Sequence, residues 1–162
     1  IYNVLKNHGL YCYKIQKINY MSGSLRVFAS NKKVKIKAKL QKISLKQFEN
    51  FKKKVNFTIK EIKKFVKKNS PVIGIGAATK GNTLLNCCSF DDTYIKFIMD
   101  RSEHKINKFT PGTGIKIIKE KNLISNYSAL ILPWNITKHL VKKNYFKKIK
   151  YTSIAKINRN TR

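Results

Sequence analysis

The feature that most constrains this chain is the regular alternation, after residue 70, of short apolar segments with segments of helical spacing. We expect strands at the apolar runs, over 71–75, 93–100, 115–119, 127–134 and 149–157. We expect helices to begin near residue 80 and to cover 120–125 and 136–148. Apolar strands that alternate with helices form a parallel sheet covered by crossover helices. The sequence therefore predicts an α/β domain over residues 71–162.

A different pattern precedes this domain. Residues 1–9 read as the end of a helix with Gly9 as its cap. Aromatic and β-branched residues over 10–18 and 24–30 predict two strands that pair antiparallel. Two strands do not form a core alone, so we expect this pair to belong to a sheet that begins upstream. The chain, which does not begin with Met, is expected to be a piece of a longer product.

A basic segment and a long helix connect these two regions. The segment over 31–42 is rich in lysine, and residues 44–69 have the pattern of an amphipathic helix with Ser44 as its N-cap. Its apolar residues recur at steps of three and four; they are Leu45, Phe48, Phe51, Val55, Ile59, Ile62 and Val66. Lysines fill the opposite face. We interpret the apolar stripe as a core-packing face.

The formal net charge of +29 invites a nucleic-acid interpretation. The basic residues, however, are 32 Lys and only 4 Arg, whereas bidentate recognition of phosphates and base edges favours Arg. The joint enrichment in Lys, Ile and Asn is typical of an A/T-rich coding sequence. We therefore interpret most lysines as solvated surface, and a basic nucleic-acid-binding protein is the weaker alternative.

Other functional classes find little support in the composition. The three cysteines and three histidines have no disulfide or zinc spacing, so no metal site is expected; they are Cys12, Cys87, Cys88, His8, His104 and His139. Seven acidic residues leave little material for acid–base catalysis. The sequence shows no signal peptide and no apolar run of membrane-spanning length. These features predict a cytoplasmic protein with no membrane partner.

One glycine-bearing turn could bind an anion. The stretch GIGAATKGNT, residues 74–83, leads from a strand into a helix but lacks both P-loop order and dinucleotide spacing. The backbone amides of Gly81, Asn82 and Thr83 at a helix N-terminus, with Lys80 beside them, would suit an anion. A tight turn in which glycine avoids a Cβ clash explains the stretch equally well.

Two further stretches follow predicted strands and so lie at the same edge of the sheet, where ligands bind in such folds. The acid of the pair Asp100–Arg101 could accept hydrogen bonds from sugar hydroxyls, or it could cap the following turn. In LPWN, Trp134 could stack on a base or sugar, although a single Trp is more often part of the core. Asn135 follows it at the same strand end.

These segments, in this order, resemble the C-terminal part of the sugar C-methyltransferases. The resemblance is carried by GSLRVFA (23–29), GAATKGNTLLN (76–86), FIMDRSEHKINKFTPGTGIKI (97–117) and LILPWN (130–135). Members of that family transfer a methyl group from S-adenosylmethionine to a carbon of a nucleotide-linked keto-deoxysugar. The reaction implied is deprotonation next to the keto group, followed by attack of the enolate carbon on the donor methyl group.

The resemblance also implies a domain organisation. Residues 1–30 would be the end of a class I methyltransferase domain, 31–70 the connection, and 71–162 a Rossmann-like C-terminal domain. The S-adenosylmethionine loop, the catalytic residues and a zinc-binding domain would lie upstream, so this chain would hold neither the donor, nor zinc, nor a catalytic residue. Its partners would be the nucleotide sugar and the upstream domains of the same polypeptide.

By the same resemblance, one set of residues is expected to bind the nucleotide sugar. Lys80, Gly81, Asn82 and Thr83 would bind diphosphate or sugar. Further residues would line the same mouth of the site; they are Asp100, Arg101, Thr110, Gly112 and Asn135. Two more, Ser24 and Arg26, would lie on the interdomain side.

Some positions depart from the family pattern. Met21 stands where the family usually has a histidine, and Ala78–Thr79 replaces a usual Pro-Ala pair. These departures leave the sugar and its nucleotide undetermined. A non-catalytic Rossmann-like nucleotide-binding module remains an alternative to the methyltransferase interpretation.

Overall fold

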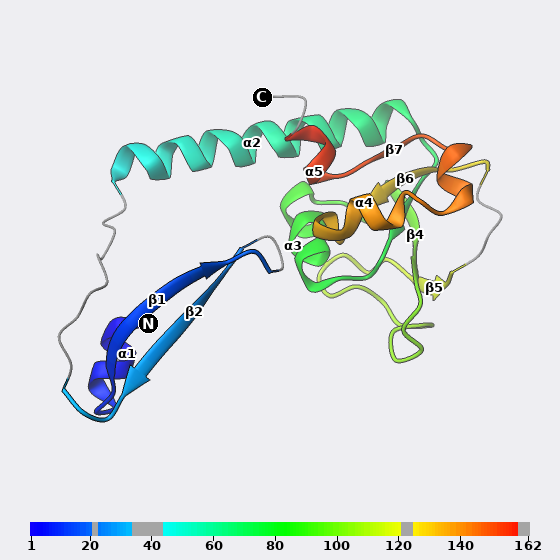
Figure 1. The fold of residues 1–162 in the computed structure, drawn as a ribbon. Helices are drawn as coiled ribbons and strands as arrows, with labels where there is room; N and C mark the ends of the chain where they lie inside the picture. Colours follow the sequence, from blue (N-terminus) through cyan, green and yellow to red (C-terminus); the bar gives the residue numbers. More distant parts are fainter. Residues whose placement is uncertain (21–22, 34–43, 121–124, 159–162) are drawn as a thin grey trace. The chain divides into compact units, whose positions relative to one another are not determined.

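The structure is a computed structural model that describes residues 1–20, 23–33, 44–120 and 125–158 (Figure 1). It divides into two compact units, Ile1–Gln47 and Phe48–Arg162. The predicted helix over 120–125 falls almost entirely outside the described residues.

The first unit is a short helix followed by a two-stranded antiparallel sheet. Helix α1 (Tyr2–Asn7) ends just before Gly9, whose φ of +71° gives the left-handed turn that the sequence predicted. Strands β1 (Tyr11–Ile18) and β2 (Ser24–Ser30) pair from Tyr11 opposite Ser30 to Ile18 opposite Ser24. The predicted antiparallel pair is confirmed.

The long helix α2 spans Leu45–Lys68. Ser44 caps it reciprocally with Gln47: the Ser44 amide donates to Gln47 Oε1 at 2.9 Å, and the Gln47 amide donates to Ser44 Oγ at 3.3 Å. The core-packing interpretation of its apolar stripe holds for the second half of the helix, where Ile62 and Val66 are buried. It is wrong for the first half, where Phe48 and Phe51 are largely exposed.

A five-stranded sheet forms the centre of the second unit. Its strands are β3 (Val72–Ile75), β4 (Ile95–Asp100), β5 (Ile117–Lys119), β6 (Ser128–Ile131) and β7 (Tyr151–Thr152). They lie in the order β5-β4-β3-β6-β7, and every pairing is parallel. The chain moves outward from β3 in one direction and then returns to continue from β6 in the other. This order is the doubly wound, Rossmann-like arrangement, and its switch point lies between β3 and β6.

Successive residues of the central strands supply two separate cores, one on each face of the sheet. Val72 faces a core completed by α2 and by α3 (Thr79–Cys88), together with the C-terminal helix α5 (Ile154–Ile157). Ile73 faces a core that includes Phe146 and is bordered by α4 (Thr137–Leu140). Helices therefore cover both faces, as the near-continuous apolar strands require.

The C-terminal elements differ from the prediction in two places. The helix predicted over 136–148 is broken into α4 and the 3₁₀ turn η2 (Asn144–Lys147). A continuous helix would turn Phe146 about 240° from Leu140, whereas both pack into the same core.

The strand predicted over 149–157 shortens to β7, and α5 follows it. Ser153 caps α5 by accepting the Lys156 amide at 3.2 Å, and Ile154 and Ile157 pack against the core from one helix face. The three-residue spacing of these isoleucines after a serine was the helix signal that the strand interpretation overlooked.

Candidate functional site

The loops that follow β3 and β6 meet at the switch point, and there Lys80 contacts Asn135. Lys80 Nζ donates to Asn135 Oδ1 at 3.0 Å and lies 5.5 Å from the centre of the Trp134 ring. These residues are 55 positions apart in the chain. The structure therefore brings together Lys80 and Asn135, which the sequence placed at the same edge, and adds the Trp134 face as a cation–π partner.

The glycines of the β3–α3 turn allow this close approach. A Cβ on Gly76 would lie 2.8 Å from the Pro133 ring, and φ at Gly76 is +80°. A Cβ on Gly81 would lie 2.4 Å from Leu132 Cβ. The glycines thus let α3 and the turn pack directly onto the end of β6, which is the tight-turn alternative.

The turn that carries Trp134 and Asn135 is held by hydrogen bonds to Thr137. It begins as the 3₁₀ helix η1 (Trp134–Ile136) and continues into α4. The hydroxyl of buried Thr137 contacts the Trp134 carbonyl at 2.8 Å and Ser153 Oγ at 3.2 Å. The start of α5 therefore fixes the turn that faces Lys80.

Asp100 ties the end of β4 to the β3–α3 turn. Its Oδ2 accepts the Ala77 amide at 2.6 Å, and its Oδ1 accepts the Ser102 amide at 2.8 Å. Lys105 donates to the Ala77 carbonyl at 2.8 Å and lies 3.7 Å from Asp100 Oδ2. Asp100 therefore has the turn-capping role that the sequence left open. Lys105 was not foreseen, because a lysine in a loop carries no sequence signal for such a contact.

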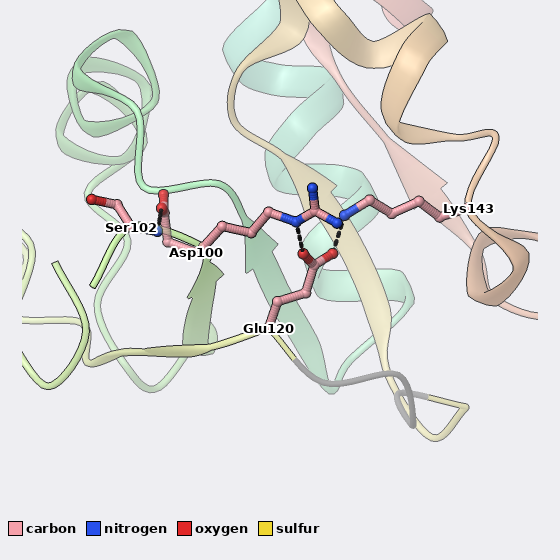
Figure 2. Close-up of polar contacts among 5 residues, drawn as sticks. Asp100, Ser102, Glu120 and Lys143 are labelled. Atoms are coloured by element: carbon pink, nitrogen blue, oxygen red, sulfur yellow. Dashed lines mark hydrogen bonds and ion pairs between the residues drawn. The ribbon is translucent and has the colours of Figure 1, made fainter. Parts of the chain in front are cut away.

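Arg101 belongs to a three-residue ion cluster. Arg101 Nε donates to Glu120 Oε2 at 2.6 Å, and Lys143 binds the other oxygen of the same carboxylate (Figure 2). Glu120 follows β5, and Lys143 follows α4. The cluster connects three segments that are distant in sequence, and neither Glu120 nor Lys143 was among the predicted site residues.

The predicted loop residues Thr110 and Gly112 shape the turn before β5. Thr110 is buried, and its hydroxyl accepts the Ile115 amide at 2.9 Å. Gly112 has φ of +77°, and a Cβ there would lie 2.4 Å from Asn86 Oδ1. Asn86 in turn donates to the Pro111 carbonyl at 3.1 Å. This loop is therefore fastened to α3.

The predicted anion site used the amides of Gly81, Asn82 and Thr83 as the free amides at the start of α3, but the helix begins before them. It starts at Thr79, and the Asn82 amide already donates to the Ala78 carbonyl at 3.0 Å. The amides without a helical acceptor are those of the first turn, Thr79 to Gly81. Thr83 lies one turn further on, and its exposed hydroxyl faces the Thr79 carbonyl at 3.5 Å. Asn82 Oδ1 is buried and has no hydrogen-bond partner among the described residues.

Ser24 and Arg26 belong to the first unit, in β2. The Ser24 hydroxyl donates to the Tyr20 carbonyl at 3.0 Å, and Arg26 pairs with Gln16 in the strand register. Their assignment to an interdomain side stays a prediction.

The described residues contain no group of three or more His, Cys, Asp or Glu side chains that could hold a metal ion. Nor do they include a helix that is both long and apolar enough to cross a membrane. Outside the switch point, burial raises the pKa of the Cys88 thiol to about 11, against the opposing effect of the nearby Lys63 charge.

Comparison with known proteins assigns the sequence to a family. The family described as "C-methyltransferase C-terminal domain" matches residues 20–152, which include β2 but not β1 of the first unit's sheet, and nearly all of the second unit. The chain belongs to this family. No curated protein matches the chain. Membership supports a methyltransferase-related function, and every switch-point residue lies inside the matched range.

The switch-point turn does not fit a methyl-donor or dinucleotide cradle. Such a cradle needs glycines that leave room for a ligand to approach the backbone. Here the space beside Gly76 is filled by Pro133, and the space beside Gly81 is filled by Leu132. The acid that would take ribose hydroxyls, Asp100, has both oxygens engaged by main-chain amides. Lys80, Asn135 and Trp134 instead bring an ammonium group, an amide and an aromatic face together at the switch point.

Proposed function

We propose that this chain is the substrate-binding C-terminal part of an S-adenosylmethionine-dependent C-methyltransferase that acts on a nucleotide-linked keto-deoxysugar. The observation that carries the proposal is the contact between Lys80 and Asn135 across the switch point. Ligands of doubly wound folds bind at the carboxyl ends of the strands at that point. The family match supports the C-methyltransferase part, and the resemblance of the motifs supports the sugar.

In this proposal Lys80 binds the diphosphate. An ammonium group has three donors, and Asn135 accepts one of them, so the contact orients Lys80 without exhausting it. The first-turn amides of α3 add the partial positive charge of a helix N-terminus. Trp134 offers an aromatic face beside this charge. Such a combination suits a phosphate with a hydroxyl-bearing ring attached.

The chemistry of methyl transfer is assigned elsewhere in the parent polypeptide. This chain would contribute binding and orientation, which lower the barrier by holding the reacting carbon in place. S-adenosylmethionine supplies the methyl group when it is bound by the upstream domain. We accordingly expect this chain to bind nucleotide and not donor.

Calorimetric titration of the chain with dTDP, and separately with S-adenosylmethionine, tests the proposal. We expect saturable dTDP binding and no donor binding. Lys80→Ala removes one charge-assisted contact, which is worth about 1.5–3 kcal/mol, or roughly ten- to a hundredfold in affinity. Lys96→Ala is the matched control, because Lys96 is an exposed lysine near the opposite, amino-terminal end of β4.

Two results would contradict the proposal. Equal dTDP affinity in the Lys80→Ala and Lys96→Ala variants would remove Lys80 from the site. Binding of S-adenosylmethionine to this chain would overturn the assignment of the donor to an upstream domain. Circular dichroism of each variant separates loss of binding from loss of folding.

A further inference from the structure

The first half of α2 continues past the sheet that its second half covers. Figure 1 shows the cyan end of this helix extending beyond the five-stranded sheet of the second unit. Phe48 is 64% exposed and Phe51 is 63% exposed, whereas Ile62 and Val66 further along are 0% and 2% exposed. The helix therefore changes from a buried element to one with two exposed phenylalanines.

The exposed phenylalanines lie on the same face of the helix as the buried residues. Phe48 and Val66 are 18 positions apart, which is five full turns, and Phe51 and Ile62 are separated by about three turns. Half-buried Val55 lies between the two groups on the same face. The apolar face that packs onto the core is thus one continuous stripe, and within the described part of the chain its Phe48–Phe51–Val55 section is the less covered one.

Lysines border this part of the stripe on both sides. Lys52 is one turn after Phe48, and Lys54 is three residues after Phe51, so that they project on opposite sides of the two rings. Both lysines are exposed. Glu49 directly follows Phe48 and therefore projects about 100° away from it. The uncovered stripe is apolar in its centre and positively charged along its edges.

We propose that the Phe48–Phe51–Val55 stripe is a docking surface for a protein partner that has an apolar centre rimmed by carboxylates. Complementary charge at the rim of an apolar contact selects the partner and excludes like-charged surfaces. A second copy of this chain would bring the bordering lysines against lysines, at a net charge of +29 on each copy. Residues 1–47 contain no Asp or Glu, so the first unit has no carboxylate to offer.

This surface is independent of the nucleotide site proposed above. An amphipathic partner helix is the simplest structure that matches a straight apolar stripe between two charged edges. Aromatic residues at the centre of such contacts carry most of the binding energy. Phe48 and Phe51 are therefore expected to dominate the affinity, and Lys52 and Lys54 the choice of partner.

The test uses the whole chain and a labelled synthetic peptide as the partner probe. The peptide is an amphipathic helix with leucines on one face and glutamates along both edges, and a second peptide carries lysines in place of the glutamates. Fluorescence anisotropy measures binding at about 0.1 M salt, where the Debye length is about 10 Å. We expect saturable binding of the acidic peptide and none of the basic one.

Two pairs of variants distinguish binding at this stripe from nonspecific binding. Phe48→Ser with Phe51→Ser is expected to weaken binding of the acidic peptide at least about thirtyfold, since two central aromatic contacts are lost. Phe57→Ser is its control, because Phe57 is 43% exposed and lies nine positions from Phe48, half a turn away around the same helix. The control is expected to bind within about twofold of the parent chain, as for a residue outside the contact.

Charge reversal tests the rim. Lys52→Glu with Lys54→Glu is expected to abolish binding of the acidic peptide and to create binding of the basic one. Lys53→Glu with Lys60→Glu makes the same change in net charge on the opposite face and should preserve the original preference.

Several outcomes would overturn the proposal. These are no binding of the acidic peptide, equal losses in the two phenylalanine variants, and equal effects of the two charge reversals. Sedimentation that shows dimers lost on Phe48→Ser with Phe51→Ser would assign the surface to a second copy. Vesicles containing phosphatidylserine that bind the chain through the same phenylalanines, in place of the peptide, would assign it to a membrane surface.

Discussion

Replacing Gly81 by alanine should destabilise the second unit, although alanine is the better helix former. Gly81 lies inside the first turn of α3, where alanine would gain about 1 kcal/mol from helix propensity. Its Cβ would lie 2.4 Å from Leu132 Cβ and 3.3 Å from Leu132 Cα. Leu132 directly follows β6, and the positions of its Cα and Cβ atoms are fixed by the backbone. A side-chain rotation therefore cannot relieve the clash, and the helix and the strand have to separate.

The size of the effect follows from that separation. The Cβ–Cβ distance falls about 1 Å short of the 3.4 Å at which ordinary contact begins. Moving α3 by that amount disturbs the buried Leu84 and Leu85 beside Leu132, and overpacking of this kind costs roughly 1–3 kcal/mol. After the helix-propensity gain, we expect a net loss of up to about 2 kcal/mol, or a fall in Tm of up to roughly 8 °C for a chain of this length.

Thermal and urea unfolding followed by circular dichroism would measure this change. Asn56→Ala on the exposed side of α2 is the control, since it gains helix propensity at an exposed helical site. We expect Asn56→Ala to leave stability unchanged or slightly raised. A Gly81→Ala variant that is stabilised to the same degree would refute the close approach of α3 to β6.

Four further predictions concern other parts of the chain. Asp100→Asn should lower stability by about 1–3 kcal/mol, because the carboxylate accepts from the Ala77 and Ser102 amides on its two oxygens and an amide side chain has only one accepting oxygen; chemical unfolding would measure the loss. Cys87, which is exposed, should react with a thiol reagent near pH 8 while buried Cys88 does not. Because burial raises the pKa of Cys88 from 9.0 to about 11, its contribution to stability should be intact below pH 9 and be lost as the pH rises from 9 to about 11, which a Cys88→Ala variant would not show. Ser44→Ala should remove the α2 cap and cost about 1 kcal/mol of local helix stability, visible as faster amide exchange in its first turn.

The candidate site was predictable in part. Lys80 and Asn135 each follow a predicted strand, so the general rule for parallel sheets placed them at one edge. Their direct contact required the order of the strands, which sequence patterns do not contain. Asp100 shows the opposite case: an acid at a strand end fits either a ligand or a turn, and only the positions of the Ala77 and Ser102 amides decided for the turn.

The sequence by itself determined the local elements, because the causes of those elements are local. The alternation of apolar runs produced the parallel strands, the steps of three and four produced α2, and Ser44 and Gly9 placed helix ends. The tertiary structure decided which faces are covered. Phe48 and Ile62 belong to one stripe in sequence, but only Ile62 meets the sheet. It also decided the form of the C-terminal segment. Phe146 packs into one core and Ile154 against the other, and this packing outweighs the helix and strand periodicity of the sequence there.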